Sequence, residues 1–160
     1  MTTQKNRSLS AHIMQWSLFT LTLAFIWGHS CMPISASAAE SGRTLELLRP
    51  LLELFVGQGN ATDHLVRKLA HFMEFAALGF QLLLLRKSKT PLDAVRSAEY
   101  GFFAAFLDES IQLLSARGAQ IIDVWLDTAG VVFGVAVAVL LCKRESTRNH
   151  RSMDVSNGCN

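Results

Sequence analysis

The sequence predicts an all-α membrane protein, a bundle of four transmembrane helices. Half of its 160 residues are hydrophobic, and they are concentrated in four blocks. Each block is close to the roughly 20 residues that a helix needs to cross about 30 Å of hydrocarbon. A soluble domain of this size would interrupt such runs with polar residues every three or four positions. We therefore expect a cytoplasmic segment at 1–12, a membrane domain at 13–142 and a disordered basic tail at 143–160.

The first apolar segment, from about residue 13 to residue 34, has two interpretations. Lys5 and Arg7 precede it, and the small residues at 35–39 resemble a signal-peptidase site. The segment is then either a retained membrane helix or a cleaved signal, which would leave a bundle of three helices. In both cases residue 40 lies outside the cell, so the rest of the topology does not depend on the choice.

A loop at 40–65 follows and contains an amphipathic helical pattern. Pro50 should bend this helix or begin a second short one. One face is apolar and is formed by Leu45, Leu48, Leu51, Leu52 and Phe55. The pattern is typical of a helix that lies on the membrane surface, and equally of a short helix that caps the bundle.

Three further apolar segments are expected at 66–85, 95–114 and 121–142. Ten of the fifteen Lys and Arg residues lie at the N-terminus, in the loop between the second and third segments, and in the C-terminal tail. The positive-inside rule then places both termini in the cytoplasm of a multi-pass protein of the inner (plasma) membrane. The three cysteines have no CxxC spacing, so neither a disulfide framework nor a zinc site is indicated.

Under this topology, polar residues from three segments converge at the external end of the bundle. These residues are Lys68, His71, Glu74, Asp108, Glu109, Gln112, Arg117, Asp123 and Asp127. At about 100° per residue, Asp123 and Asp127 share a stripe with Gly130 and Gly134, a GxxxG pair that permits close helix approach. Both carboxylates should therefore face inward. Such a cluster is either functional or a salt-bridge network that fixes helix register.

Three sequence blocks resemble the VanZ-like family of membrane proteins. They are RKLAHFMEFAALG at 67–79, DESIQ at 108–112 followed by Arg117, and DVWLDTAGVVFG at 123–134. The resemblance covers roughly residues 10 to 142 and implies a small multi-spanning domain of the bacterial cell envelope. It also implies a link to resistance against teicoplanin, a glycopeptide. Asp127 departs from the pattern, because the family usually has Asn there.

Three functions compete at this stage. The first is a non-enzymatic protein that binds an anionic lipid headgroup or envelope precursor through Arg117 and Lys68. The second is an enzyme acting on a lipid-linked substrate, with His71 and Glu109 or Asp108 as an acid–base pair and carboxylates that could hold a divalent cation. The third is a proton-coupled carrier, which would need a homo-oligomer.

We rank the binding protein first. The sequence has no HExxH, P-loop or Gly-x-Ser-x-Gly motif, so no known catalytic geometry supports an enzyme. We accordingly assign no metal and no cofactor. A basic–aromatic pattern typical of nucleic-acid binding is also missing from the sequence.

Overall fold

The computed structural model describes residues 2–32, 34–59, 61–114 and 121–157, and these residues form five α-helices. The helices are α1 (Thr2–Ser30), α2 (Ile34–Val56), α3 (Asp63–Leu84), α4 (Pro91–Leu114) and α5 (Ile121–Asn157). The all-α class is as predicted. By length and composition, one described helix, over Ile121–Glu145, is long and apolar enough to cross a membrane. The four-helix transmembrane bundle is therefore not established by these criteria. Among the described helices α1, α3 and α4 do not meet them, and α3 and α4 each carry several charged residues.

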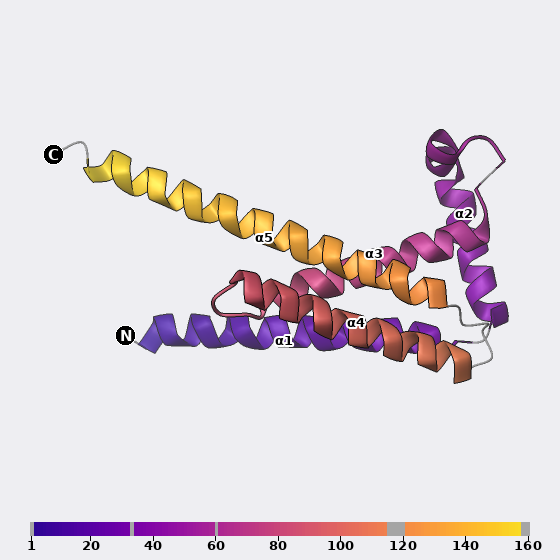
Figure 1. Ribbon diagram of the computed structural model, residues 1–160, viewed down its shortest axis with the longest axis horizontal. Helices are drawn as coiled ribbons and strands as arrows, with labels where there is room; N and C mark the ends of the chain where they lie inside the picture. The colour runs from indigo at the N-terminus through magenta and orange to yellow at the C-terminus, as the bar shows by residue number, and fades with distance from the viewer. Residues whose placement is uncertain (1, 33, 60, 115–120, 158–160) are drawn as a thin grey trace.

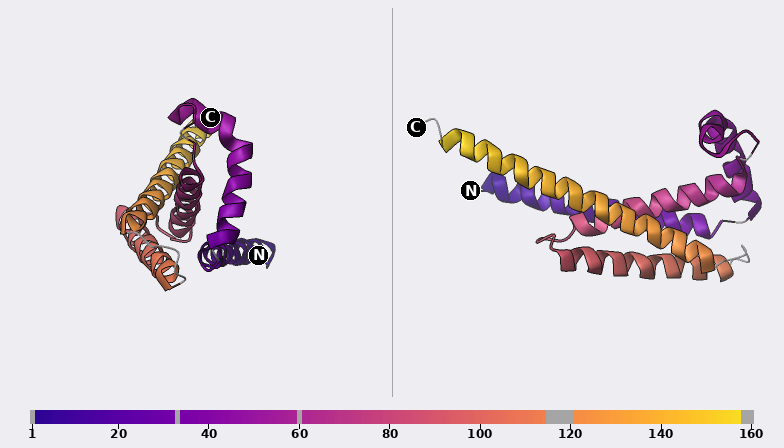
Figure 2. Two further views of the ribbon diagram at one scale, coloured as in Figure 1. Left: turned by 90° about the vertical axis from the view of Figure 1, so that its right-hand side faces the viewer. Right: turned by 45° about the horizontal axis from the view of Figure 1, so that its top comes forward.

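Four helices run roughly along one axis, and α2 lies across them at one end (Figures 1 and 2). Both chain termini and the loop between α3 and α4 are at the opposite end (Figure 1). α3 is central, because it contacts each of the other four helices, and its contact with α5 is the most extensive. This arrangement brings the start of α3, the end of α4 and the start of α5 to the same end of the bundle.

Glycine allows α3 and α5 to approach closely. A Cβ added at Gly130 or Gly134 of α5 would collide with the backbone carbonyl oxygen of Phe72 or Ala76 on α3. Gly79 of α3 is packed equally tightly against the backbone of Val131. The GxxxG face of α5 thus lies directly on α3, where only residues without a side chain fit.

The core is apolar and lies between α1, α3, α4 and α5. Its largest fully buried side chains are Phe75, Leu78 and Leu83 of α3, Ile26 of α1 and Val131 of α5. On α3 the buried residues recur at helical spacing, so a single stripe faces its neighbours. α1 therefore contributes to the same core as the other long helices.

Some apolar residues of α2 pack against α3, and others are exposed on its surface. The helix continues through Pro50, and its last part turns away from the axis of its first part (Figure 1). Leu45 and Leu52 are buried against Val66 of α3, but Leu51 is 56% exposed. The face that meets α3 is therefore narrower than the apolar sector of the helix. The side chain of Phe55 lies outside the described part.

The polar ends are also helical where we expected less structure. α1 begins at Thr2, and α5 continues to Asn157, through most of the segment expected to be disordered from residue 143 onward. The sequence contains no proline or glycine between Gly134 and Gly158, so nothing in the local chemistry ends the helix at the apolar boundary.

Candidate functional site

A polar centre lies inside the bundle at the end where α3 begins. We use this name for His29, His71, Glu74, Asp108, Gln112 and Asp127. His71 belongs to α3, Asp108 to α4 and Asp127 to α5. All three are buried, with exposed fractions of 7%, 0% and 1%. Side chains from three helices therefore meet in a region that water scarcely reaches.

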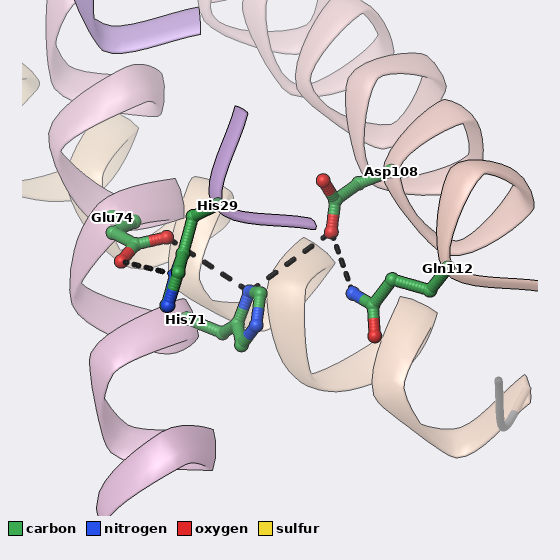
Figure 3. A network of polar contacts seen from close by, with 5 residues as sticks. All are labelled: His29, His71, Glu74, Asp108 and Gln112. Atoms are coloured by element: carbon green, nitrogen blue, oxygen red, sulfur yellow. Dashed lines mark hydrogen bonds and ion pairs between the residues drawn. The ribbon is translucent and has the colours of Figure 1, made fainter. Parts of the chain in front are cut away.

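The contacts around His71 form a short network (Figure 3). His71 Nδ1 lies 3.9 Å from Glu74 Oε2 and 4.0 Å from Asp108 Oδ2. The Gln112 amide donates a hydrogen bond of 2.8 Å to Asp108 Oδ2. Because Asp108 and Gln112 are four residues apart, they lie on one face of α4. The imidazole is thus placed between two carboxylates from different helices.

A partly exposed ion pair forms the outer edge of this centre. Lys68 Nζ lies 2.8 Å from Asp123 Oδ1, with 29% and 27% of the two side chains exposed. The two residues lie about one helical turn before His71 and Asp127 in their respective helices. The pair therefore joins α3 to α5 between the buried residues and the end of the bundle.

The structure brings together most of the residues proposed from the sequence. Lys68 pairs with Asp123, and His71, Glu74, Asp108, Gln112 and Asp127 meet in the polar centre. Glu109 is buried on α4. Arg117 falls in the stretch between α4 and α5 that lies outside the described residues. The positions do not test what the cluster does, so its functional role stays a prediction.

Sequence reasoning missed His29. Its ring stacks on that of His71, with centroids 6.0 Å apart and planes inclined by 17°, and its Nδ1 lies 3.9 Å from Glu74 Oε1. A signal was available, because His29 stands near the external end of the first apolar segment, at the depth of the other polar ends. The predicted cluster contained residues of the other three apolar segments and none of the first apolar segment.

The chain is therefore an all-α helical bundle with an internal polar centre, where one histidine and several carboxylates are buried between the helices. The comparison with known families then gives the particular family. The model described as VanZ/LLP1 matches residues 14–142, and the chain belongs to this family. Neither the curated proteins nor the solved structures include a significant match to the chain.

Proposed function

We propose that this chain is a multi-pass protein of the bacterial inner (plasma) membrane that binds the headgroup of a lipid or lipid-linked envelope precursor at the edge of its polar centre. The supporting observation is that several ionisable side chains are buried while many large apolar side chains are exposed, the reverse of what a water-soluble protein shows. His71 and three carboxylates of α4 and α5 are buried, whereas large apolar side chains such as Phe25, Phe103 and Phe133 are more than half exposed. Water-soluble monomers rarely expose extensive apolar surface, whereas a bilayer solvates it.

The dimensions of the helices suit this placement. α3, with 22 residues, is about 33 Å long at 1.5 Å per residue, which matches a hydrocarbon core of about 30 Å. The charged residues of α3 lie in its first twelve residues, toward the end where α2 lies. Those of α4 are divided between its first nine residues and its last seven, so both groups lie toward the ends of the helix, where headgroups and water would be. α2 packs on α3 through one face and exposes Leu47, Leu51 and Leu54 on another. That second face suits the membrane surface.

The charges of the polar centre limit what the ligand can contact. Its described carboxylates outnumber its cations, so an anionic headgroup would be repelled from the interior. Lys68 is the one described lysine at its edge, and it is 29% exposed on its side chain. The proposed contact is therefore between a lipid phosphate and Lys68, as a charge-assisted hydrogen bond. The carboxylates would face an uncharged or cationic part of the ligand.

Native mass spectrometry of the protein released from mild detergent tests this proposal. We expect wild type to retain a phosphate-bearing lipid and Lys68→Gln to lose it. Lys87→Gln is the matched control, because Lys87 is exposed in the loop at the other end of the bundle. Equal lipid retention by wild type and Lys68→Gln would contradict the proposal, and so would equal loss from both variants. Expression in a teicoplanin-sensitive host adds a cellular readout for the resistance link that the family resemblance implies.

The placement of His71 favours one second candidate, an enzyme acting on a lipid-linked substrate. An imidazole between Glu74 and Asp108 has the composition of an acid–base pair. Under this alternative, His71→Gln would still bind the lipid but would no longer convert it. Mass analysis of a lipid extract incubated with each protein distinguishes the two candidates, because a binding protein leaves every headgroup unchanged.

A further inference from the structure

Three side chains of the polar centre are close enough to share one metal ion. His71, Asp108 and Asp127 each offer a ligand atom, and these atoms lie within 4.8 Å of one another. Two ligands on one ion are separated by at most twice the metal–ligand distance, which is about 4–5 Å for bonds of about 2.0–2.6 Å. Ligand atoms up to 4.8 Å apart lie at the upper end of this range. The three side chains, one each from α3, α4 and α5, would therefore move slightly closer together around a bound ion.

The carboxylate of Asp127 gives independent support for a bound cation. Only 1% of this residue is exposed, and neither carboxylate oxygen accepts a hydrogen bond from any described residue. Asp108 uses Oδ2 to accept from Gln112, but its Oδ1 has no such donor in the described part of the chain. A buried carboxylate without compensation is costly, so these oxygens require a proton or a cation.

The charged groups around them do not supply that cation. Glu74 and Glu109 add further carboxylates, and Lys68 is held by Asp123 at 2.8 Å. Among the described residues, no Lys or Arg forms an ion pair with Asp108 or Asp127. A divalent ion would offset two negative charges in one step and would reduce the repulsion between the neighbouring carboxylates.

We infer that His71, Asp108 and Asp127 bind a divalent cation that links α3, α4 and α5. One imidazole with two carboxylates suits Zn²⁺ or Mn²⁺ better than Mg²⁺ or Ca²⁺, which prefer oxygen ligands alone. Gln112 orients Asp108 and Glu74 lies near the His71 ring, as outer-shell partners of metal ligands do. This site does not depend on lipid binding, and it replaces our sequence-based expectation of no metal.

The test uses the full chain in mild detergent, stripped with a chelator and titrated with ZnCl₂ or MnCl₂ alone. We expect wild type to bind one equivalent of at least one of these ions in calorimetry, with a rise in melting temperature. Asp127→Asn keeps the shape of the side chain but removes its charge. We expect binding about 100-fold weaker or more, because outer-shell changes alone weaken metal sites by about 10–100-fold.

Glu99→Gln is the matched control, since Glu99 is an exposed carboxylate of α4 that lies nine residues before Asp108 and outside the polar centre. It should retain the affinity of wild type within a few-fold. If Asp127→Asn does not fold, His71→Gln provides the same comparison from α3. Failure of wild type to bind either ion would overturn the inference and would leave protons as the compensating charge. Equal affinity in wild type and Asp127→Asn, or equal loss in Glu99→Gln, would also overturn it. None of these results bears on lipid retention, so the two proposals fail separately.

Discussion

At the scale of single residues, glycine decides how closely the two main helices pack. Gly134 lies where any side chain would meet the carbonyl oxygen of Ala76, whereas a methyl group added at Gly28 on α1 would have no neighbouring atom within 4 Å. Helix propensity favours alanine over glycine at both positions by about 0.5–1 kcal/mol. Packing against α3 opposes this preference for alanine at Gly134, whereas nothing opposes it at Gly28.

Substitution by alanine should therefore destabilise the protein at Gly134 but not at Gly28. We expect Gly134→Ala to lower the free energy of unfolding by about 1–3 kcal/mol, because a methyl group forced into a packed interface displaces backbone. Gly28→Ala should leave stability unchanged or raise it by up to about 1 kcal/mol. Thermal unfolding in detergent measures both. Stabilisation by Gly134→Ala would show that α3 and α5 are not in close contact at this point.

At the scale of an element, the start of α4 shows how local sequence fixes a helix. The Thr90 N–H donates to Asp93 Oδ2 at 3.0 Å, and the Asp93 N–H donates to Thr90 Oγ1 at 3.2 Å, which is a reciprocal cap. Pro91 at the first helical position needs no hydrogen-bond partner for its nitrogen. Hydrogen bonds from the Thr90 backbone and side chain lower the pKa of Asp93 below its ordinary value of 3.8.

This cap gives a pH-dependent prediction. Because the folded pKa is lower than the unfolded one, the stabilisation is present above pH 3.8 and is lost as the pH falls through the folded pKa. We expect Asp93→Asn to melt below wild type at neutral pH, with a difference that shrinks in acid. Glu99→Gln, an exposed change on the same helix, controls for the loss of one negative charge. A difference in melting temperature that is the same in neutral and acidic buffer would contradict the assignment.

At the scale of the whole molecule, the arrangement of the helices makes the topology testable. The α2–α3 connection lies at the end with the polar centre, and the α3–α4 loop lies with both termini at the other end (Figure 1). We expect the first to be outside the cell and the second in the cytoplasm, as the distribution of Lys and Arg predicts.

Cysteine labelling in intact cells measures this directly. In a chain whose native cysteines are replaced by serine, a membrane-impermeant maleimide should label Gln58→Cys but not Ser88→Cys until the cells are opened. Both positions are in connections between helices, and Gln58 and Ser88 are both exposed, so access differs only by the side of the membrane. Labelling of Ser88→Cys in intact cells would reverse the orientation, and labelling of both would argue against a spanning bundle.

Much of the fold was predictable because its signals are local. Four apolar segments correspond to α1, α3, α4 and α5, with bounds shifted by polar residues that continue a helix beyond the apolar stretch. The inward direction of Asp127 followed from its helical phase relative to Gly130 and Gly134. The exposure of Leu51 and the contribution of His29 did not follow, because each depends on which neighbour a helix meets.

The sequence by itself determined the four apolar helical segments and the glycine face of α5. Each follows from spacing along one helix, which is fixed by 3.6 residues per turn. Only the tertiary structure decided that His71, Asp108 and Asp127 approach within the reach of one ion while Lys68 is held by Asp123. That choice depends on how each helix is rotated and placed against the others, and packing between helices sets both.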